Sequence, residues 1–350
     1  MTTTQRILVG YEATPSGEDA LAAGAALAAS FGADLHVALV MPDTSRRGNV
    51  PNDPAYDALL RDTAEGWLAD ARTRVESSVA FSGRVVFGDS LAEGLLTAAE
   101  ELDATLIVVG AARGGLLGRF TVGSVAGALL HASPVPVLLA PEGWRERAPR
   151  LTRVTSMVGT RAGATDVLVT GERLSAAAGV PLRLVSLLAL DLPGDAAAPK
   201  QSVGEHHAAA VLEEASAATG VVATAVVAKG DNIQDAVSRL DWEPGEVVVV
   251  GSSRLAQPSR LFLGSTAAAM LRELPMPMLR GACCDSSQLI LCKGRLTLQS
   301  NAAGARRPMF TSLREGSSCL PWVSPHSAPS PVSRSSSACR SAGCARTRSA

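Results

Sequence analysis

The sequence predicts an α/β protein built from two tandem domains, each a five-stranded, parallel, doubly wound sheet, followed by an irregular C-terminal tail. Three observations carry this prediction. The chain has 350 residues, about twice the length of an ordinary domain. A set of residues recurs at a constant spacing. Within each repeat, apolar runs alternate with Ala-rich and Leu-rich helical segments, which is typical of a parallel sheet covered by helices on both faces.

The repeat indicates a tandem duplication. Seven residues have an identical partner 141 positions later: Gly110, Arg113, Arg119, Gly123, Ser124, Pro134 and Pro136 match Gly251, Arg254, Arg260, Gly264, Ser265, Pro275 and Pro277. The pair Gly88-Asp89 recurs as Gly230-Asp231, 142 positions later. We therefore expect one domain over 1–141, a polar linker over 142–151 and a second domain over 152–279.

The first domain alternates strands and helices in order. We expect strands at Arg6–Gly10, Leu35–Met41, Val79–Phe87, Thr105–Val109 and Val135–Ala140. We expect helices at Ser16–Phe31, Ala55–Val75, Leu91–Leu102 and Ser124–His131. Right-handed crossovers between parallel strands then produce the doubly wound arrangement.

The second domain repeats this plan. We expect strands at Arg153–Val158, Leu182–Leu188, Val221–Val227 and Val247–Val250. We expect helices near Val167–Ala178, Gly204–Thr219, Ile233–Leu240 and Thr266–Glu273. Asp43–Pro54 and Asp191–Gln201 are rich in turn-forming residues and are predicted to be matching long loops.

Composition and charge exclude several function classes. The chain is 47% apolar but only 3% aromatic, so Ala, Val and Leu must build the core. Its net charge of −1 argues against nucleic acid and anionic membranes as partners, because both require a basic face. All six Cys lie at or after Cys283, so the body has no disulfide framework. The first residues lack the apolar run of a signal peptide, and we expect a cytoplasmic protein.

The candidate site follows the fourth strand of the first domain. In doubly wound sheets ligands bind beyond the carboxyl ends of the strands, at the point where the strand order reverses. The strand Thr105–Val109 ends at Gly110, and a loop leads to Gly123-Ser124 at a helix start. Glycines let a ligand approach the backbone, and a helix start offers free N–H groups to phosphate. Arg113 and Arg119 are candidate phosphate ligands. This chemistry suits a nucleotide.

Gly110, followed thirteen residues later by Gly123-Ser124 on a duplicated five-strand unit, resembles the universal stress protein family over residues 5–279. The resemblance implies a Rossmann-like, HUP-type fold. It also implies ATP binding through Gly-x2-Gly-x9-Gly-Ser/Thr, an Asp after the first strand, and a backbone contact from a Val after the second strand to adenine. Carried over, the nucleotide-binding residues are Glu12, Val40, Gly110, Arg113, Gly114, Gly123 and Ser124.

The sequence departs from the family pattern in two places. Arg113 replaces the second Gly, with glycines displaced to Gly114 and Gly115, and Glu12 replaces the Asp. The second domain keeps a weaker set, Gly251, Arg254, Gly264 and Ser265, but Gly159-Thr160 supplies no acid after its first strand. The first domain is therefore the better nucleotide site, and the second is largely architectural.

The residues alone leave a structural interpretation open. Gly110 and Gly251 can simply end buried strands, and Gly123-Ser124 can be an ordinary helix start. No P-loop, Ser/His/Asp set or Cys/His set appears, and adjacent His206-His207 point to different helix faces. We therefore expect no catalytic residues and no resident metal, apart from Mg accompanying ATP.

The predicted function is an ATP-binding regulatory or sensing module of the stress response. Its expected partners are adenine nucleotide and either a second copy in a homodimer or the other repeat of the same chain. Two alternatives remain at this point: a nucleotide-independent interaction scaffold of the same fold, which Arg113 and Glu12 favour, and a slow ATPase, which the lack of a second acid near the loop disfavours.

The tail differs in composition from the body. Residues 280–350 hold nine Arg and one Lys against Asp285 and Glu315, a net of +8, so the first 279 residues carry −9. Sequence periodicity ends after Leu279. We interpret 280–350 either as the product of a frameshift near Leu279 or as a disordered basic arm. With a frameshift, the second domain lacks most of its fifth strand and leaves an unpaired edge.

Overall fold

The computed structural model describes residues 5–42, 54–111, 123–147, 149–159, 164–189, 197–251, 265–271 and 273–280. Four of the predicted site residues, Arg113, Gly114, Arg254 and Gly264, lie outside these ranges, and so do Arg119 and the tail from 281 to 350. The described residues include the strands of both predicted domains.

The elements of the first repeat follow the expected order. They are β1 (Arg6–Gly10), α1 (Pro15–Phe31), β2 (Asp34–Pro42), α2 (Pro54–Thr73), β3 (Phe81–Gly88), α3 (Leu91–Glu101), β4 (Leu106–Gly110), α4 (Ser124–Ala132) and β5 (Val137–Ala140). After a short 3-10 helix, η1 (Trp144–Glu146), the second repeat contains β6 (Arg153–Met157), α5 (Ala164–Ala178), β7 (Leu182–Ala189), α6 (Ala197–Ala218), β8 (Ala223–Gly230), α7 (Ile233–Ser238), β9 (Glu246–Val250), α8 (Ser265–Leu271) and β10 (Met278–Arg280).

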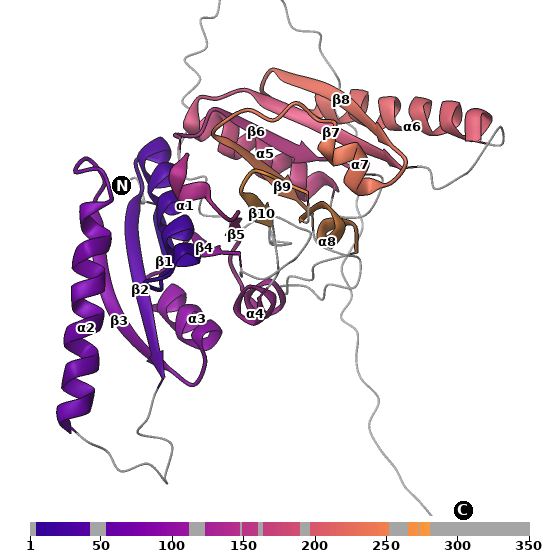
Figure 1. Ribbon diagram of the computed structural model, residues 1–350. Coiled ribbons are helices and arrows are strands. Elements are labelled where there is room, and N and C mark those ends of the chain that lie inside the picture. Colours follow the sequence, from indigo (N-terminus) through magenta and orange to yellow (C-terminus); the bar gives the residue numbers. More distant parts are fainter. Residues whose placement is uncertain are drawn as a thin grey trace, which may run out of the picture. The chain divides into compact units, whose positions relative to one another are not determined.

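The ten strands form one sheet in the order β3-β2-β1-β4-β5-β10-β9-β6-β7-β8 (Figure 1). Strands within each repeat pair in parallel, and β10 pairs with β5 in the antiparallel direction. In the first repeat the strand order reverses between β1 and β4. The helices that follow these two strands, α1 and α4, therefore lie on opposite faces of the sheet. A ligand site is therefore expected beyond the carboxyl ends of these two strands.

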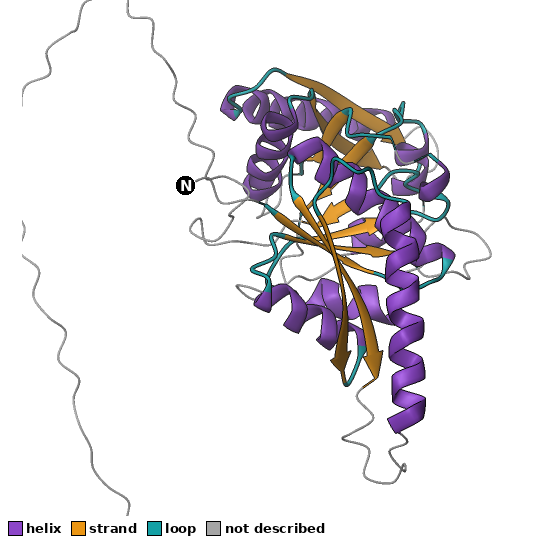
Figure 2. Cartoon of the chain, turned by 90° about the vertical axis from the view of Figure 1, so that its left-hand side faces the viewer, coloured by secondary structure: helices purple, strands orange, loops and turns teal. Residues whose placement is uncertain are grey.

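Helices cover both faces of the sheet (Figure 2). Helix α3 packs on α4 and on β2 and β3, whereas α1 packs on β1 and β4. Glu18 of α1 pairs with Arg74, the residue that follows α2, at 2.5 Å. The two pairs of helices thus enclose the strands, and the buried central residues Ile7, Leu8 and Val9 of β1 are at most 1% exposed. The doubly wound fold that the sequence predicts is confirmed.

The recurring Gly-Asp pair is a strand-to-helix turn in both repeats. Gly88 ends β3 and Gly230 ends β8. A Cβ on Gly230 would lie 2.3 Å from the backbone nitrogen of Ala236, so the strand end approaches the next helix too closely for any side chain. Helix α3 then begins at the N-cap Ser90, whose hydroxyl accepts from the Glu93 N–H at 3.2 Å, while the Glu93 carboxylate accepts from the Asp89 N–H at 3.1 Å.

One helix is longer than its pattern predicts. Helix α6 begins at Ala197, seven residues before the expected Gly204, so residues 197–201 of the predicted loop Asp191–Gln201 are helical. Pro199 is compatible with this start, because the first N–H groups of a helix have no intrahelical partner and a proline there loses no bond. The Pro and Ala residues of this segment are typical of a loop, but they are also compatible with the first turn of a helix.

The expectation of an unpaired edge in the second repeat is wrong. Strand β10 pairs with β9 from Val248 to Val250 on one side and with β5 from Val137 to Leu139 on the other. Met278 and Leu279 are buried. Three residues are enough because β5 itself has only four, and both neighbours supply hydrogen bonds to the short strand. The two repeats are thereby joined into one sheet within the chain.

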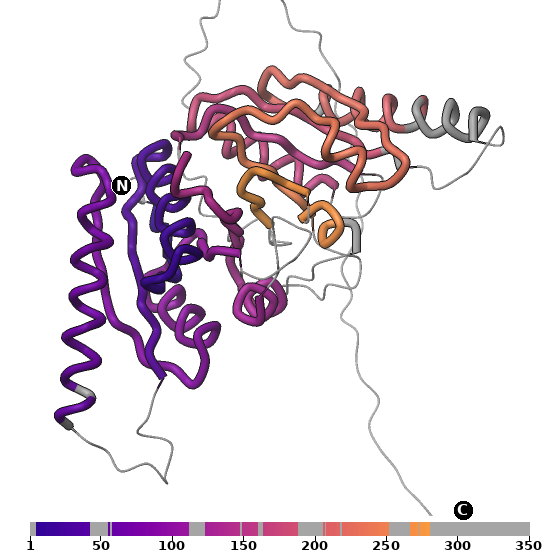
Figure 3. Tube along the Cα trace, in the orientation of Figure 1, coloured from indigo at the N-terminus to yellow at the C-terminus, as the bar shows by residue number. Residues whose placement is uncertain are grey.

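The segment predicted as a polar linker packs on the first repeat. The chain runs from β5 through η1 to β6 (Figure 3). Trp144 of η1 is 3% exposed. The carboxylate of Asp19, from α1, is also buried and accepts hydrogen bonds from the backbone N–H groups of Gly143 and Arg145. The charged residues on both sides of Trp144 are typical of an exposed linker, so the sequence did not predict this packing.

The second repeat contains a buried ion network. Glu246 of β9 is fully buried, and its two carboxylate oxygens accept from Arg183 and Arg153, each at 2.7 Å. The Thr155 hydroxyl donates to Glu246 and accepts from Arg183 Nε. The guanidinium of Arg183 also lies over the Trp242 ring, 5.0 Å from its centroid. These contacts link β6, β7 and β9 at the start of the strands.

Glu246→Ala should destabilise the protein strongly. It leaves the buried Arg183 guanidinium, and the partly buried Arg153 guanidinium, without their shared acid, and breaking a buried pair in this way typically costs about 3–5 kcal/mol. Glu76→Ala is the control, since Glu76 pairs with Arg150 on the exposed surface. Denaturant unfolding measures both variants, and equal small effects would contradict the assigned role of the network.

The contribution of β10 to the stability of the sheet can be tested by truncating the chain before or after this strand. A chain of residues 1–280 keeps β10 and should retain the thermal unfolding midpoint of the full chain. A chain of residues 1–274 loses β10, which exposes the edges of β5 and β9 and the apolar side chains that pack on it. Its midpoint should be lower. Identical midpoints for the two truncated chains would show that β10 does not stabilise the sheet.

Candidate functional site

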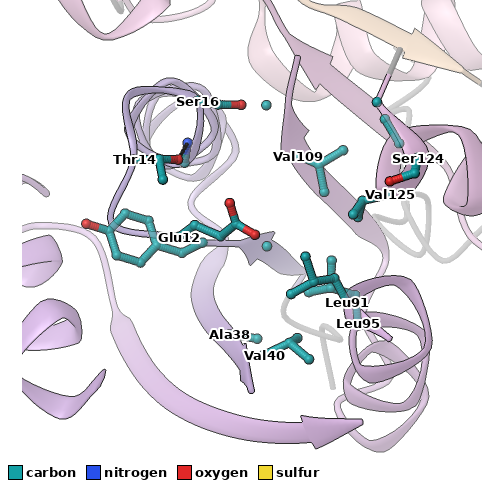
Figure 4. A pocket seen from close by; sticks show the side chains of 16 residues that line it. Glu12, Thr14, Ser16, Ala38, Val40, Leu91, Leu95, Val109, Ser124 and Val125 are labelled. Atoms are coloured by element: carbon teal, nitrogen blue, oxygen red, sulfur yellow. Dashed lines mark hydrogen bonds between the residues drawn. The ribbon is translucent and has the colours of Figure 1, made fainter. Parts of the chain in front are cut away.

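A cavity of about 360 Å³ lies at the carboxyl ends of β1 and β4 (Figure 4). Its walls come from the residues after β1, the first turn of α1, the middle of β2, the start of α3, the end of β4 and the first turn of α4. The lining residues are Gly10, Tyr11, Glu12, Thr14, Ser16, Gly17, Ala38, Val40, Leu91, Leu95, Val109, Gly110, Gly123, Ser124, Val125 and Ala126. The cavity therefore occupies the place that the strand order predicts.

A tight turn connects β1 to α1 along one wall. The Thr14 N–H donates to the carbonyl of Glu12 at 2.7 Å, and the Thr14 hydroxyl caps α1 by accepting from the Gly17 N–H at 3.2 Å. A Cβ on Gly17 would lie 2.0 Å from the carbonyl oxygen of Glu12. Only glycine allows this approach, which directs the Glu12 side chain from the strand end toward the middle of the cavity (Figure 4).

Gly110 brings the end of β4 against the same turn. A Cβ on Gly110 would lie 2.0 Å from the carbonyl oxygen of Ser16 and 2.4 Å from its Oγ. The Ser16 hydroxyl donates to the carbonyl of Ala111 at 2.6 Å. Gly110 thus permits close contact between a helix and a strand that are 94 positions apart in the chain. This is a structural reason for the glycine in addition to its place in the cavity wall.

The first turn of α4 forms the opposite wall. Gly123 is the N-cap, with ordinary backbone angles of φ −67° and ψ 168°, and it has no side chain with which to cap the helix. The first N–H groups of an α-helix lack partners within the helix and carry its positive dipole end. Ser124 adds a hydroxyl on this wall (Figure 4). This wall is suited to an anion.

The remaining walls are apolar. Val40 projects from β2, Leu91 and Leu95 lie one turn apart on α3, and Val109 and Val125 come from β4 and α4 (Figure 4). A Cβ on Gly94 would lie 2.5 Å from Val40 Cγ1, so this glycine lets α3 pack directly against the β2 residue. The apolar side is suited to a flat, uncharged group such as a nucleobase.

Charge in the described part of the cavity is limited. Glu12 is the only carboxylate among the described lining residues, and no Lys or Arg is among them. Tyr11 is buried, and burial raises the pKa of its phenol, so it remains neutral. No group of three or more potential metal ligands occurs within the residues that the structure describes. Arg113 and Arg119, the expected phosphate ligands, lie outside them.

Five of the seven residues predicted for the first site line this cavity: Glu12, Val40, Gly110, Gly123 and Ser124. The other two, Arg113 and Gly114, are outside the described ranges. In the second repeat, Gly251 directly follows β9 and Ser265 begins α8, whereas Arg254 and Gly264 are not described. Thr14, Ser16 and Gly17 also line the cavity, although the sequence did not predict them as site residues. A helix-start pattern directly after the first strand was the signal that could have found them.

Comparisons with known proteins agree on one family. The profile of the Universal stress protein family matches residues 3–141 and 155–280. Universal stress proteins of Mycobacterium tuberculosis and Mycobacterium bovis are each 30% identical over 293 residues, covering 78% of this chain and 98% of theirs. A solved universal stress protein from Archaeoglobus fulgidus shares the fold with a TM-score of 0.55 at 16% identity, covering 79% of this chain and 98% of its own.

The described helices include none that is both long and apolar enough to cross a bilayer. The family profile ends at residue 280, the last residue of β10, so the match spans both halves of the ten-stranded sheet. The resemblance drawn from Gly110 and Gly123-Ser124 is confirmed: the chain belongs to the universal stress protein family and carries two copies of its domain.

Proposed function

We propose that the first repeat binds an adenine nucleotide, with ATP as the ligand, and that the protein acts as a regulatory or sensing module of the stress response. One observation carries the proposal: a single cavity at the β1–β4 switch point combines an apolar wall, a carboxylate and an uncapped helix start. This combination matches the three parts of a nucleotide. Family membership supports the assignment, since the resemblance implies ATP binding at these positions.

Each part of the ligand has a suitable wall. Adenine would lie on the side of Val40, Leu91 and Leu95, where its rings displace water from apolar side chains. The ribose hydroxyls would donate to Glu12. The phosphates would face the first N–H groups of α4 and the Ser124 hydroxyl.

The phosphate charge requires cations that the described wall does not contain. We infer that Arg113 and Arg119, which belong to the chain between Gly110 and Gly123, supply them and compensate for the missing second Gly. Mg would arrive bound to the phosphates, because one carboxylate at Glu12 is too few for a protein-built site. We assign no catalytic step to the cavity, since its only described acid is allotted to the ribose.

The second repeat is proposed to bind nucleotide more weakly than the first. Gly251 and Ser265, with Arg254 and Gly264, would form a weaker nucleotide site, because no acid follows β6. Its ion network around Glu246 and its pairing through β10 support an architectural role instead. We infer that the first repeat senses the nucleotide and that the second supports it.

Nucleotide binding is tested by a substitution at the α4 start. Gly123→Ala places a methyl group where the phosphates would meet the helix, while its φ and ψ suit alanine. ATP affinity by calorimetry should fall at least about tenfold, which is ~1.4 kcal/mol. Gly123→Ser also adds a Cβ but is a good N-cap, so it separates lost binding from a frayed helix.

Gly66→Ala is the control, since Gly66 lies on exposed α2 with nothing within 4 Å of an added Cβ. It should bind ATP as the wild type does. Nucleotide released by denaturing the purified wild-type protein provides a second readout. A wild-type protein that neither carries nor binds ATP would support the nucleotide-independent scaffold, and sustained phosphate release would support a slow ATPase.

A further inference from the structure

The linker between the repeats is attached to α1 through a buried acid. Asp19 is 1% exposed. Its Oδ2 accepts from the Gly143 N–H at 2.9 Å, and its Oδ1 accepts from the Arg145 N–H at 2.8 Å. The Arg145 guanidinium adds hydrogen bonds from Nη1 at 3.1 and 3.2 Å to the two oxygens. A carboxylate buried on a helix is thus satisfied by the linker rather than by its own repeat's strands.

The Arg145 side chain continues toward the start of the helix. Its Nη1 lies 3.4 Å from the carbonyl oxygen of Pro15, and its Nε lies 3.4 Å from Glu18 Oε2. The other oxygen of Glu18 pairs with Arg74 at 2.5 Å, and this hydrogen bond raises the pKa of Arg74. The Arg145 side chain therefore contacts three residues in the first turns of α1. Acidic and basic side chains alternate along this cluster, from Asp19 to Arg145 to Glu18 to Arg74.

The turn that Arg145 holds is a wall of the nucleotide cavity. Thr14, Ser16 and Gly17 line the cavity, and Pro15 lies between them. The turn fits against Glu12 and Gly110 at distances that leave no room for a Cβ. A small displacement of the turn would therefore change both the direction of Glu12 and the contact with β4. Arg145 is not itself a lining residue, so any effect on the ligand must pass through α1.

The same linker also contacts the second repeat. Trp144 borders a small apolar space together with Ala23 and Leu27 of α1 and with Val247 and Pro277 of the second repeat. Leu151 donates its N–H to the Ser30 hydroxyl of α1 at 3.1 Å. The linker thus contacts α1 at Asp19 and at Ser30, and its Trp144 lines an apolar space that the second repeat also lines.

We propose that Arg145 is a positioning residue for the nucleotide cavity, which holds the first turn of α1 in the geometry that the ligand requires and links that turn to the rest of the linker. The inference rests on the proposed function. Because coupling between two sites is reciprocal, a nucleotide that needs this turn in place also stabilises the linker contacts.

Arg145→Ala in the full-length protein tests the proposal. The backbone donors of residues 143 and 145 remain on Asp19, so the fold should persist. The Kd for ATP of the folded protein should rise at least about fivefold, the lower range of measured couplings between sites. Arg150→Ala is the matched control: this linker arginine pairs with exposed Glu76 at 2.7 Å and not with a residue of α1. It should leave the Kd unchanged. An unchanged Kd in Arg145→Ala, with only a lower unfolding midpoint, would overturn the proposal.

A measurement without nucleotide separates this proposal from the proposed function. Amide hydrogen exchange in residues 16–19 should be faster in Arg145→Ala than in the wild type, and unchanged in Arg150→Ala. If the wild type binds no ATP, the proposed function fails, whereas faster exchange would still support the positioning of the turn. Equal exchange in wild type and Arg145→Ala would overturn the positioning role whatever the nucleotide result.

Discussion

The structure of the site depends on one steric constraint, the contact of the first turn of α1 with the ends of β1 and β4. Two glycines permit it: Gly17 against the carbonyl of Glu12, and Gly110 against the carbonyl of Ser16. With the turn in this place, the Glu12 side chain faces the cavity and the α4 start closes the opposite side. A larger residue at either glycine would force the helix away from the sheet and open the cavity floor.

The two repeats share a topology but have come to differ in what stabilises them. The first has a cavity with an acid at the strand switch point, and its linker is tied to Asp19. The second has buried Arg and Glu side chains at the start of its strands and a fifth strand of three residues. Because β5 and β10 are antiparallel, the strands of the two repeats run in opposite directions, and their carboxyl ends lie at opposite ends of the strands. The cavity of the first repeat and the residues Gly251 and Ser265 of the second repeat therefore do not share one face of the protein.

Much of the fold could be predicted because its signals are local. Apolar runs such as Ile7–Val9 and Ala-rich helices mark each element, and the repeated glycines at Gly110 and Gly123 mark the end of β4 and the start of α4. Glu12, Val40 and Ser124 could be placed near the cavity from family resemblance. Contacts between distant residues could not be predicted in this way. Nothing local shows that Gly110 fits against Ser16, that Asp19 receives the linker, or that three residues after Pro277 complete the sheet.

The most direct test of the account is a crystal structure of the full chain grown with ATP and Mg. The account predicts adenine against Val40 and Leu95, ribose at Glu12, and phosphates at the N–H groups that follow Gly123, with α1's first turn still against Gly110. Nucleotide bound elsewhere, or a cavity that holds only solvent at saturating ATP, would contradict it.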